Sequence, residues 1–220
     1  MREFYNLGDL INRNRDLHKT AVIDLGGETS PREFSFDALD RMANGVARGL
    51  LVRGLARGER VAILAANRAE YLAAYYGIMR AGLVAVPVNF KFPPALIEVV
   101  LRDCDARLVF CDPRRRSDCP AALPVIDFGD LRPQGFGHFL DPGPFTAVQP
   151  APAEPAMFLY TSGSTGKPKG VVLSHQSHLW VVRTRLEGQD MARQPRRSKV
   201  EVLVQLRTCQ VSFQEEARFI

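Results

Sequence analysis

Three short apolar runs in the first half of the chain constrain its fold more than any other feature. They are RVAILA at 60–65, LVAVPV at 83–88 and ARLVFC at 106–111. Runs of this length, bounded by polar residues, are typical of strands that are buried on both faces of a parallel sheet. The residues between them have helical spacing, which supplies the crossovers that parallel strands require. The sequence therefore predicts an α/β fold, a mostly parallel sheet with flanking helices.

The flanking helices have identifiable starts. Ser35 is a good N-cap residue, and the apolar residues after it recur at the spacing of one buried helix face. These residues are Leu39, Met42, Val46 and Leu50. A second helix is expected from a cap at Asn67 to Arg80, and a third is expected to begin at Pro93 and Pro94.

The regions on either side of this pattern are less regular. A short amphipathic helix at about 4–14 and a strand at 20–25 are expected before it. Nine of the fifteen prolines lie in 112–155, where only 123–128 has the pattern of a strand. Because a strand pattern resumes at 156–160, we expect the proline-rich stretch to be a connecting excursion rather than a linker between independent domains.

Composition excludes several classes of protein. An apolar fraction of 46% and a charged fraction of 24% are those of a globular chain that can bury a core. The four cysteines have neither zinc-ligand spacing nor the pattern of a disulfide framework, so no metal site is predicted and a reducing compartment is favoured. They are Cys104, Cys111, Cys119 and Cys209. The sequence shows no secretory signal and no transmembrane segment, and a cytoplasmic location is expected.

The net charge of +5 does not by itself identify a partner. Arginines cluster at 114–116 and 196–197, but neither cluster has interleaved aromatic residues or the spacing of one helix face. Residues 181–220 hold eight Lys or Arg against five Asp or Glu. A nucleic-acid-binding tail is therefore the weakest functional hypothesis, and no nucleic acid is expected among the partners.

The strongest functional signal is the segment YTSGSTGKPKG at 160–170, which joins two strands or a strand and a short extension. Its hydroxyls can donate hydrogen bonds to phosphate oxygens, its glycines let successive backbone N–H groups converge, and its lysines supply positive charge. The hydroxyls belong to Thr161, Ser162, Ser164 and Thr165, the glycines are Gly163, Gly166 and Gly170, and the cations are Lys167 and Lys169. This combination favours a polyphosphate-binding loop over a merely flexible Ser/Gly loop.

The loop is not a Walker A motif, in which Gly-Lys is followed by Ser or Thr and preceded by an earlier glycine at a fixed spacing. Here Pro168 follows Gly166 and Lys167, and Thr161 occupies the position of the first glycine. Proline directly after the lysine also disfavours the helix that a Walker loop opens. The sequence therefore excludes a P-loop kinase or GTPase.

The segment YTSGSTGKPKGV resembles the signature loop of the adenylate-forming superfamily, which includes acyl-CoA synthetases, peptide-synthetase adenylation domains and luciferases. FSFDALD at 34–40 and IMRAGLVAVPVN at 78–89 resemble two further motifs of that family, in the same order along the chain. The resemblance covers residues 1 to about 185. It implies a partial N-terminal AMP-binding (adenylation) domain at 1–185 and leaves 186–220 as an atypical tail that could be frameshifted or disordered.

The resemblance implies that the loop binds the phosphates of ATP, with Mg²⁺, while a substrate carboxylate attacks the α-phosphorus. Pyrophosphate leaves, an acyl-adenylate remains, and a thiol, usually that of coenzyme A, then displaces AMP. Position by position, the phosphate contacts fall on Thr161, Ser162, Gly163, Ser164 and Thr165. Lys169 matches the family's recurrent lysine, Gly166 belongs to the same loop, and Lys167 occupies a variable position. Fatty and aryl acids are both compatible as substrates.

The family's later motifs, which hold adenine, ribose and the catalytic lysine of a mobile C-terminal domain, have no counterpart in these 220 residues. We therefore assign no catalytic residue and expect a truncated acyl-CoA synthetase that is inactive as this fragment. The alternative, from another class, is a non-catalytic protein that binds nucleotide or pairs with a partner supplying the rest.

His175 and His178, with Ser174 and Ser177 nearby, could suggest nucleophilic catalysis. No acidic partner and no nucleophile-elbow motif supports that hypothesis, and capping of a helix by Ser174 is favoured. Trp180 is expected to be a packing residue.

Overall fold

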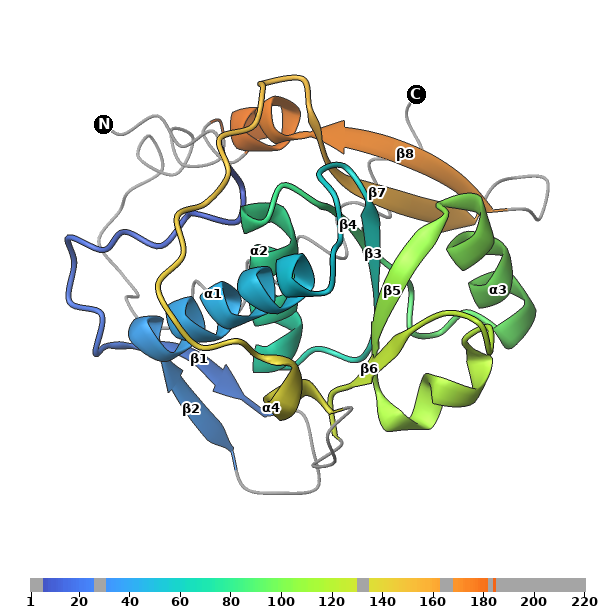
Figure 1. The fold of residues 1–220 in the computed structure, drawn as a ribbon, viewed down its shortest axis with the longest axis horizontal. Helices are drawn as coiled ribbons and strands as arrows, with labels where there is room; N and C mark the ends of the chain where they lie inside the picture. The colour runs from blue at the N-terminus through green and yellow to red at the C-terminus, as the bar shows by residue number, and fades with distance from the viewer. Residues whose placement is uncertain (1–5, 26–30, 130–134, 163–167, 182–183, 185–220) are drawn as a thin grey trace, which may run out of the picture.

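The computed structural model describes residues 6–25, 31–129, 135–162, 168–181 and 184. Within them, six strands form one sheet in the order β6-β5-β3-β4-β7-β8 (Figure 1). Their bounds are β3 (Arg60–Leu64), β4 (Val84–Pro87), β5 (Ala106–Cys111), β6 (Val125–Asp127), β7 (Pro155–Ser162) and β8 (Pro168–Ser174). Every neighbouring pair is parallel except the antiparallel pair β7 and β8. The predicted mostly parallel sheet is confirmed, and it contains all three apolar runs.

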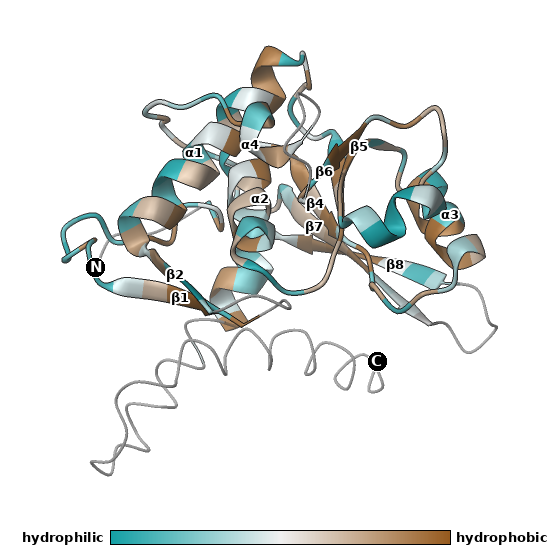
Figure 2. Ribbon diagram, turned by 90° about the horizontal axis from the view of Figure 1, so that it is seen from below, coloured by the Kyte–Doolittle hydropathy of each residue, from teal (hydrophilic) through white to brown (hydrophobic). Residues whose placement is uncertain are grey.

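Helices cover both faces of this sheet, as predicted. α1 (Phe36–Val52) and α2 (Ala69–Arg80) lie on one face and α3 (Pro94–Asp103) lies on the other, as Figures 1 and 2 both show. Alternate residues of a strand therefore enter two different cores. Ile63 of β3 packs in the cluster with α1 and α2, whereas its neighbour Leu64 packs in the cluster with α3. Burial on both faces explains why the strands are continuously apolar.

The start of α1 agrees with the sequence prediction. Ser35 Oγ accepts a hydrogen bond from the backbone N–H of Ala38 at 3.1 Å, which is an N-cap interaction. The predicted apolar stripe faces the core, and its members are Leu39, Val46 and Leu50, which are buried, and Met42, which is partly buried.

The predicted cap of α2 is wrong. The N-cap position is Arg68 rather than Asn67, and Arg68 makes no side-chain cap bond. The N–H of Ala69 donates instead to Asp24 Oδ2 at 3.3 Å, from the end of strand β1 (Thr20–Asp24). A carboxylate from a distant strand thus has the role that a local side chain usually has at a helix N-terminus.

The predicted helix at about 4–14 is also wrong over its described part, 6–14, which forms turns and chain without regular secondary structure. The side chain of Asn6 explains the difference. Its Oδ1 accepts from the N–H of Gly8 at 2.7 Å, and its Nδ2 donates to the carbonyls of Met79 and Val148 at 2.9 and 2.8 Å. Such bonds compete with helix formation, and here they attach the N-terminal segment to the end of α2.

The remaining elements extend this framework. β1 confirms the strand predicted at 20–25 and pairs with β2 (Arg32–Ser35) in a separate two-stranded sheet. The proline-rich stretch is a connecting excursion, as expected: it contributes the 3₁₀ helix η1 (Pro113–Asp118), strand β6 and the short helix α4 (Phe136–Phe139) before the chain returns as β7. No helix among the described residues is long and apolar enough to cross a membrane.

Candidate phosphate-binding site

The loop singled out in the sequence lies at the end of an antiparallel hairpin formed by β7 and β8. The register places Thr161 opposite Lys169 and Ser162 opposite Pro168. The prediction that the segment joins two strands is therefore confirmed. The other predicted phosphate contacts lie outside the described residues, and they are Gly163, Ser164, Thr165, Gly166 and Lys167.

The strand alternation places Thr161 and Lys169 on one face of the hairpin. Met157 and its cross-strand partner Leu173 both pack on the core with α1 and α2. Residues two and four positions closer to the loop on each strand share that face, and the residues four positions closer are Thr161 and Lys169. Thr161 is half-buried there and Lys169 is exposed. Among the described residues, no carboxylate forms an ion pair with Lys169. The hairpin end therefore presents, side by side, a hydroxyl and a cation that no described carboxylate neutralises, which suits an anion.

Gly170 serves the hairpin through its small size rather than through a special backbone conformation. It lies in the β8 ladder opposite Tyr160, and a Cβ at this position would meet the Tyr160 ring at 3.0 to 3.2 Å. The Tyr160 hydroxyl in turn donates to Asp103 Oδ2 at 2.5 Å, at the end of α3. Burial and this bond raise the pKa of Tyr160, so the hydroxyl remains a donor. Tyr160 thus fixes the hairpin to α3 across the backbone of Gly170.

Ser174 and His175 have structural roles just after the hairpin. Ser174 Oγ accepts from the N–H of Ser177 at 3.1 Å at the start of a helical segment, which confirms the predicted cap. His175 is 2% exposed, and its Nδ1 accepts from the backbone N–H of Leu7 at 3.0 Å. An imidazole occupied in this way is not a base for a neighbouring serine. The predicted packing role of Trp180 is wrong, because its side chain is 67% exposed.

We expect His175 to make the fold sensitive to acid. Burial lowers the pKa of His175 to about 4, below its ordinary value of 6.5, so the fold favours the neutral imidazole. The resulting stability is complete above pH 6.5 and is lost as the pH falls from 6.5 to about 4, on the order of 3 kcal/mol in all. Urea unfolding at pH 7 and pH 4.5 measures the loss.

His175→Asn is the matched variant for this measurement. Its side-chain oxygen can still accept from Leu7 N–H, but it cannot be protonated. The difference in free energy of unfolding between the two pH values should therefore shrink by about 2 kcal/mol in His175→Asn. An equal pH dependence in both proteins would show that the buried imidazole does not contribute.

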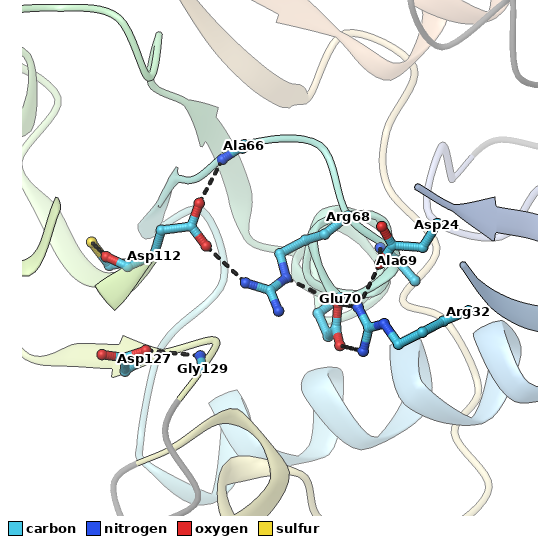
Figure 3. Close-up of polar contacts among 10 residues, drawn as sticks. Asp24, Arg32, Ala66, Arg68, Ala69, Glu70, Asp112, Asp127 and Gly129 are labelled. Carbon is cyan, nitrogen blue, oxygen red and sulfur yellow. Dashed lines mark hydrogen bonds and ion pairs between the residues drawn. The ribbon is translucent and has the colours of Figure 1, made fainter. Parts of the chain in front are cut away.

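A second polar cluster, which the sequence analysis missed, lies at the carboxyl ends of β3 and β5 (Figure 3). Arg32 pairs with both Asp24 and Glu70, and Arg68 pairs with both Glu70 and Asp112. Burial would raise the pKa of Glu70, but hydrogen bonds from the two arginines outweigh it and the pKa is lowered. The arginines and carboxylates of this cluster are paired with one another. The cluster therefore joins β1 and β2 to the sheet rather than offering a free charge. Only the fold brings these residues together, so no sequence spacing indicated them.

A shallow hollow of about 410 Å³ lies elsewhere on the molecule. Its walls come from the amino ends of β3 and β5 and from the chain beside them, and the residues are Arg53, Gly54, Leu55, Glu59, Arg107, Leu108 and Pro124. The hairpin loop instead follows the carboxyl end of β7. Ligands of open α/β sheets bind at the carboxyl ends of strands, so we do not assign the hollow to the phosphate site.

Comparison with known protein families assigns the chain to one of them. The sequence matches the family described as AMP-binding enzyme over residues 11–206. The chain belongs to this family of AMP-binding enzymes. The match confirms the resemblance drawn from the three sequence segments, and it includes 186–206, which lie beyond the point where that resemblance was placed and outside the described residues.

Individual AMP-binding enzymes resemble the chain in sequence and in structure. A 3-hydroxybenzoate–CoA/4-hydroxybenzoate–CoA ligase of Thauera aromatica is 34% identical over 161 residues, which are 67% of this chain and 31% of that ligase. The crystal structure of the anthranilate CoA ligase AuaEII in complex with anthranoyl-AMP matches with a TM-score of 0.72 and 27% identity, over 83% of this chain and 37% of that one. ATP-bound MatB from Rhodopseudomonas palustris matches with a TM-score of 0.63 and 30% identity, over 73% and 32%.

The extent of these matches shows how much of the family fold this chain contains. The chain spans about a third of the length of each of these AMP-binding enzymes. The α/β layers and the hairpin belong to the N-terminal part of the adenylate-forming fold, as predicted.

Proposed function

We propose that this chain is the N-terminal part of the adenylation domain of an acyl- or aryl-CoA ligase, and that its β7–β8 hairpin binds the phosphates of ATP. One observation carries the proposal: the exposed Lys169 lies beside Thr161 at the end of a hairpin, in a member of the AMP-binding enzyme family. The relatives support it, because two of them are CoA ligases and a third was solved with ATP.

The proposed phosphate-binding residues are those of the loop and its two strands. They are Thr161, Ser162, Gly163, Ser164, Thr165, Gly166, Lys167 and Lys169. Bound ATP would supply the α-phosphorus that a fatty or aryl carboxylate attacks, with pyrophosphate as the leaving group. The hydroxyls and the ammonium groups would bind and orient the phosphates and offset the charge that builds on them.

Mg²⁺ and coenzyme A complete the proposed reaction, but we assign neither to a residue of this chain. Among the described residues, no group of three or more His, Cys, Asp or Glu side chains is placed to hold a metal ion. The proposal includes a cytoplasmic location, for which the lack of a disulfide pattern in the sequence is the support, and no nucleic-acid partner.

Lys169→Ala is expected to weaken ATP binding about tenfold, because a charge-assisted contact to phosphate is worth roughly 1.4 kcal/mol or more. Lys169→Arg keeps the positive charge and should lose less. Isothermal titration calorimetry with ATP on the full chain measures both affinities.

Lys19→Ala is the matched control, because Lys19 is also exposed but precedes β1, far along the chain from the hairpin. It should bind ATP as the unmodified chain does. Equal ATP affinity in Lys169→Ala and Lys19→Ala would contradict the assignment of the hairpin as the phosphate site.

We further propose that these 220 residues do not form an acyl-adenylate on their own, with 1–185 as the partial adenylation domain and 186–220 as an atypical tail. The support is that the sequence holds none of the family's later motifs and spans about a third of the relatives. ATP–pyrophosphate exchange measured with a panel of fatty and aryl acids should not exceed the rate without acid. Exchange above that rate with any acid would contradict the inactivity.

A non-catalytic interaction protein is the second candidate function. Strand β8 ends the sheet of the described residues and exposes Val171 and Val172, and Trp180 follows it, also exposed. Exposed apolar side chains on an edge strand favour association with another chain. Size-exclusion chromatography with light scattering would detect a stable complex of this chain with another chain. Such a complex, together with ATP binding but no ATP–pyrophosphate exchange, would favour this function over a ligase.

A further inference from the structure

Two thiols meet beside the carboxyl end of β5. Cys111 is the last residue of that strand and Cys119 directly follows the 3₁₀ helix η1, and their Sγ atoms are 3.9 Å apart. Cys111 is fully buried, whereas Cys119 is partly exposed. Nothing in the proposed ligase reaction uses either residue.

The backbone around η1 holds this approach. Arg115 N–H donates to Asp112 O at 2.9 Å, and Cys119 N–H donates to Arg116 O at 3.2 Å, so the chain turns back on itself over the end of β5. Cys111 lies in strand ladders on both sides, opposite Leu64 and Asp127. Its position is therefore fixed, and Cys119 is the partner that can shift.

The two sulfurs lie near van der Waals contact, with no other atom needed to bridge them. A disulfide has its sulfurs about 2.05 Å apart, so the pair needs an approach of roughly 2 Å, which side-chain rotation with a small backbone shift provides. Cys104 offers a contrast within the same chain. Its Sγ is directed to the carbonyl of Leu101 at 3.5 Å, and it has no thiol neighbour among the described residues.

The charges around the pair differ for the two sulfurs. The hydrogen bond with Cys111 lowers the pKa of Cys119, and the positive charges of Arg116 and Arg115 act in the same direction. Burial and the carboxylate of Asp118 oppose this shift without reversing it. The same hydrogen bond and burial raise the pKa of Cys111, and the carboxylates of Asp127 and Asp112 act in the same direction. The partly exposed Cys119 is accordingly the sulfur that carries thiolate character, which a nucleophilic thiol requires.

We propose that Cys111 and Cys119 are an oxidative modification site, at which hydrogen peroxide converts the two thiols into an intramolecular disulfide. The Cys119 thiolate attacks one peroxide oxygen, the O–O bond breaks, and the departing hydroxide takes up a proton to become water. The Cys111 sulfur then attacks the sulfur of the resulting sulfenic acid. The S–S bond forms, the S–O bond breaks, and the hydroxyl leaves with the thiol proton as a second water. Two electrons pass from the thiols to the peroxide.

The sequence between the cysteines makes this product easy to recognise. Arg114, Arg115 and Arg116 lie between them, so trypsin separates the two thiols into different peptides. After peroxide treatment and blocking of free thiols with N-ethylmaleimide, we expect these two peptides to be joined and to separate on reduction. The full chain carries Cys209→Ser for this test, because a further thiol would allow other pairings.

The matched variants distinguish a specific pair from general thiol oxidation. Cys104→Ser should still give the linked peptide, whereas Cys119→Ser should not. The assay does not depend on whether Cys111→Ser folds, because the link is read in a protein that retains both thiols. Complete maleimide labelling of Cys111 and Cys119 after peroxide, a link to Cys104, or a link found only between two chains by intact mass would each overturn the proposal.

Discussion

Gly77→Ala is expected to lower the free energy of unfolding by about 3 kcal/mol, because α1 and α2 cross too closely at Gly77 for a larger residue. A Cβ there would lie 2.5 Å from Val46 Cβ and 2.6 Å from the carbonyl oxygen of Ala43, both on α1. Contacts this short force a shift, and a backbone oxygen cannot move without its helix. Helix propensity alone would favour alanine by about 1 kcal/mol, so the sign of the change separates the two effects.

Gly137→Ala is the matched control for this substitution. Gly137 lies in α4, and a Cβ there would meet no atom within 4 Å. Its change in free energy of unfolding should be within about 1 kcal/mol of zero, and on the stabilising side. Urea unfolding of both variants measures the contrast. A Gly77→Ala protein as stable as Gly137→Ala would mean that the two helices can separate at little cost.

The spacing of α1 and α2 also bears on the hairpin. The Tyr75 hydroxyl on α2 donates to the sulfur of Met157 at 3.3 Å, and Met157 lies in β7. A shift of α2 away from α1 therefore reaches the strand that carries Thr161. We expect a folded Gly77→Ala protein to bind ATP more weakly than Gly137→Ala does, measured by the same calorimetry.

The sequence predicted those features that depend on local pattern. From Val61 and from Leu108 onward, the runs at 60–65 and 106–111 are buried on both faces of a parallel sheet, and residues in such positions must be apolar. Ser35 caps α1 because its hydroxyl reaches an N–H three residues away, which a sequence directly displays. The hairpin was predictable for the same reason, since its turn-forming loop lies between two apolar strands.

Features that depend on contacts between distant segments were not predictable. The cap of α2 comes from Asp24, 45 residues before Ala69, and no local spacing could reveal it. Gly77 and Gly170 look like ordinary glycines in the sequence, yet each is required by a neighbour that only the fold brings close. The role of Gly170 was misjudged for that reason: it makes room for an aromatic ring and was expected to supply backbone freedom.

Arg80 joins two of the segments through which the chain resembles its family. It lies in the segment 78–89, and its Nη2 is 2.8 Å from Asp40 Oδ1, in the segment 34–40, an ion-pair distance without hydrogen-bond geometry. Its Nε donates to the carbonyl of Gly8 at 2.7 Å, and its Nη1 donates to Asn44 Oδ1 at 2.6 Å and to the carbonyl of Asp40 at 3.1 Å. The Arg80 side chain is completely buried, so water does not compete with it for these acceptors. Three segments of the chain therefore depend on one guanidinium.

Arg80→Ala is expected to lower the free energy of unfolding by about 4 kcal/mol. Removing one member of a buried ionic network leaves its partners unsatisfied and opens a cavity. The Asp40 carboxylate keeps its pairing with Arg13, so the loss falls mainly on Asn44 and on the carbonyls of Gly8 and Asp40. Arg80→Met retains most of the volume without the donors, and it should recover only the part of the loss that comes from the cavity.

Arg102→Ala is the matched control, because Arg102 is 73% exposed and forms an ion pair with Glu98 one turn earlier on the same helix. Exposed pairs of this kind contribute about 0.5 kcal/mol or less. Urea unfolding should therefore separate the two arginine variants by more than about 3 kcal/mol. Similar free energies of unfolding for Arg80→Ala and Arg102→Ala would show that water or neighbouring groups satisfy the Arg80 acceptors. In that case the N-terminal segment would be held by Asn6 and His175 without help from Arg80.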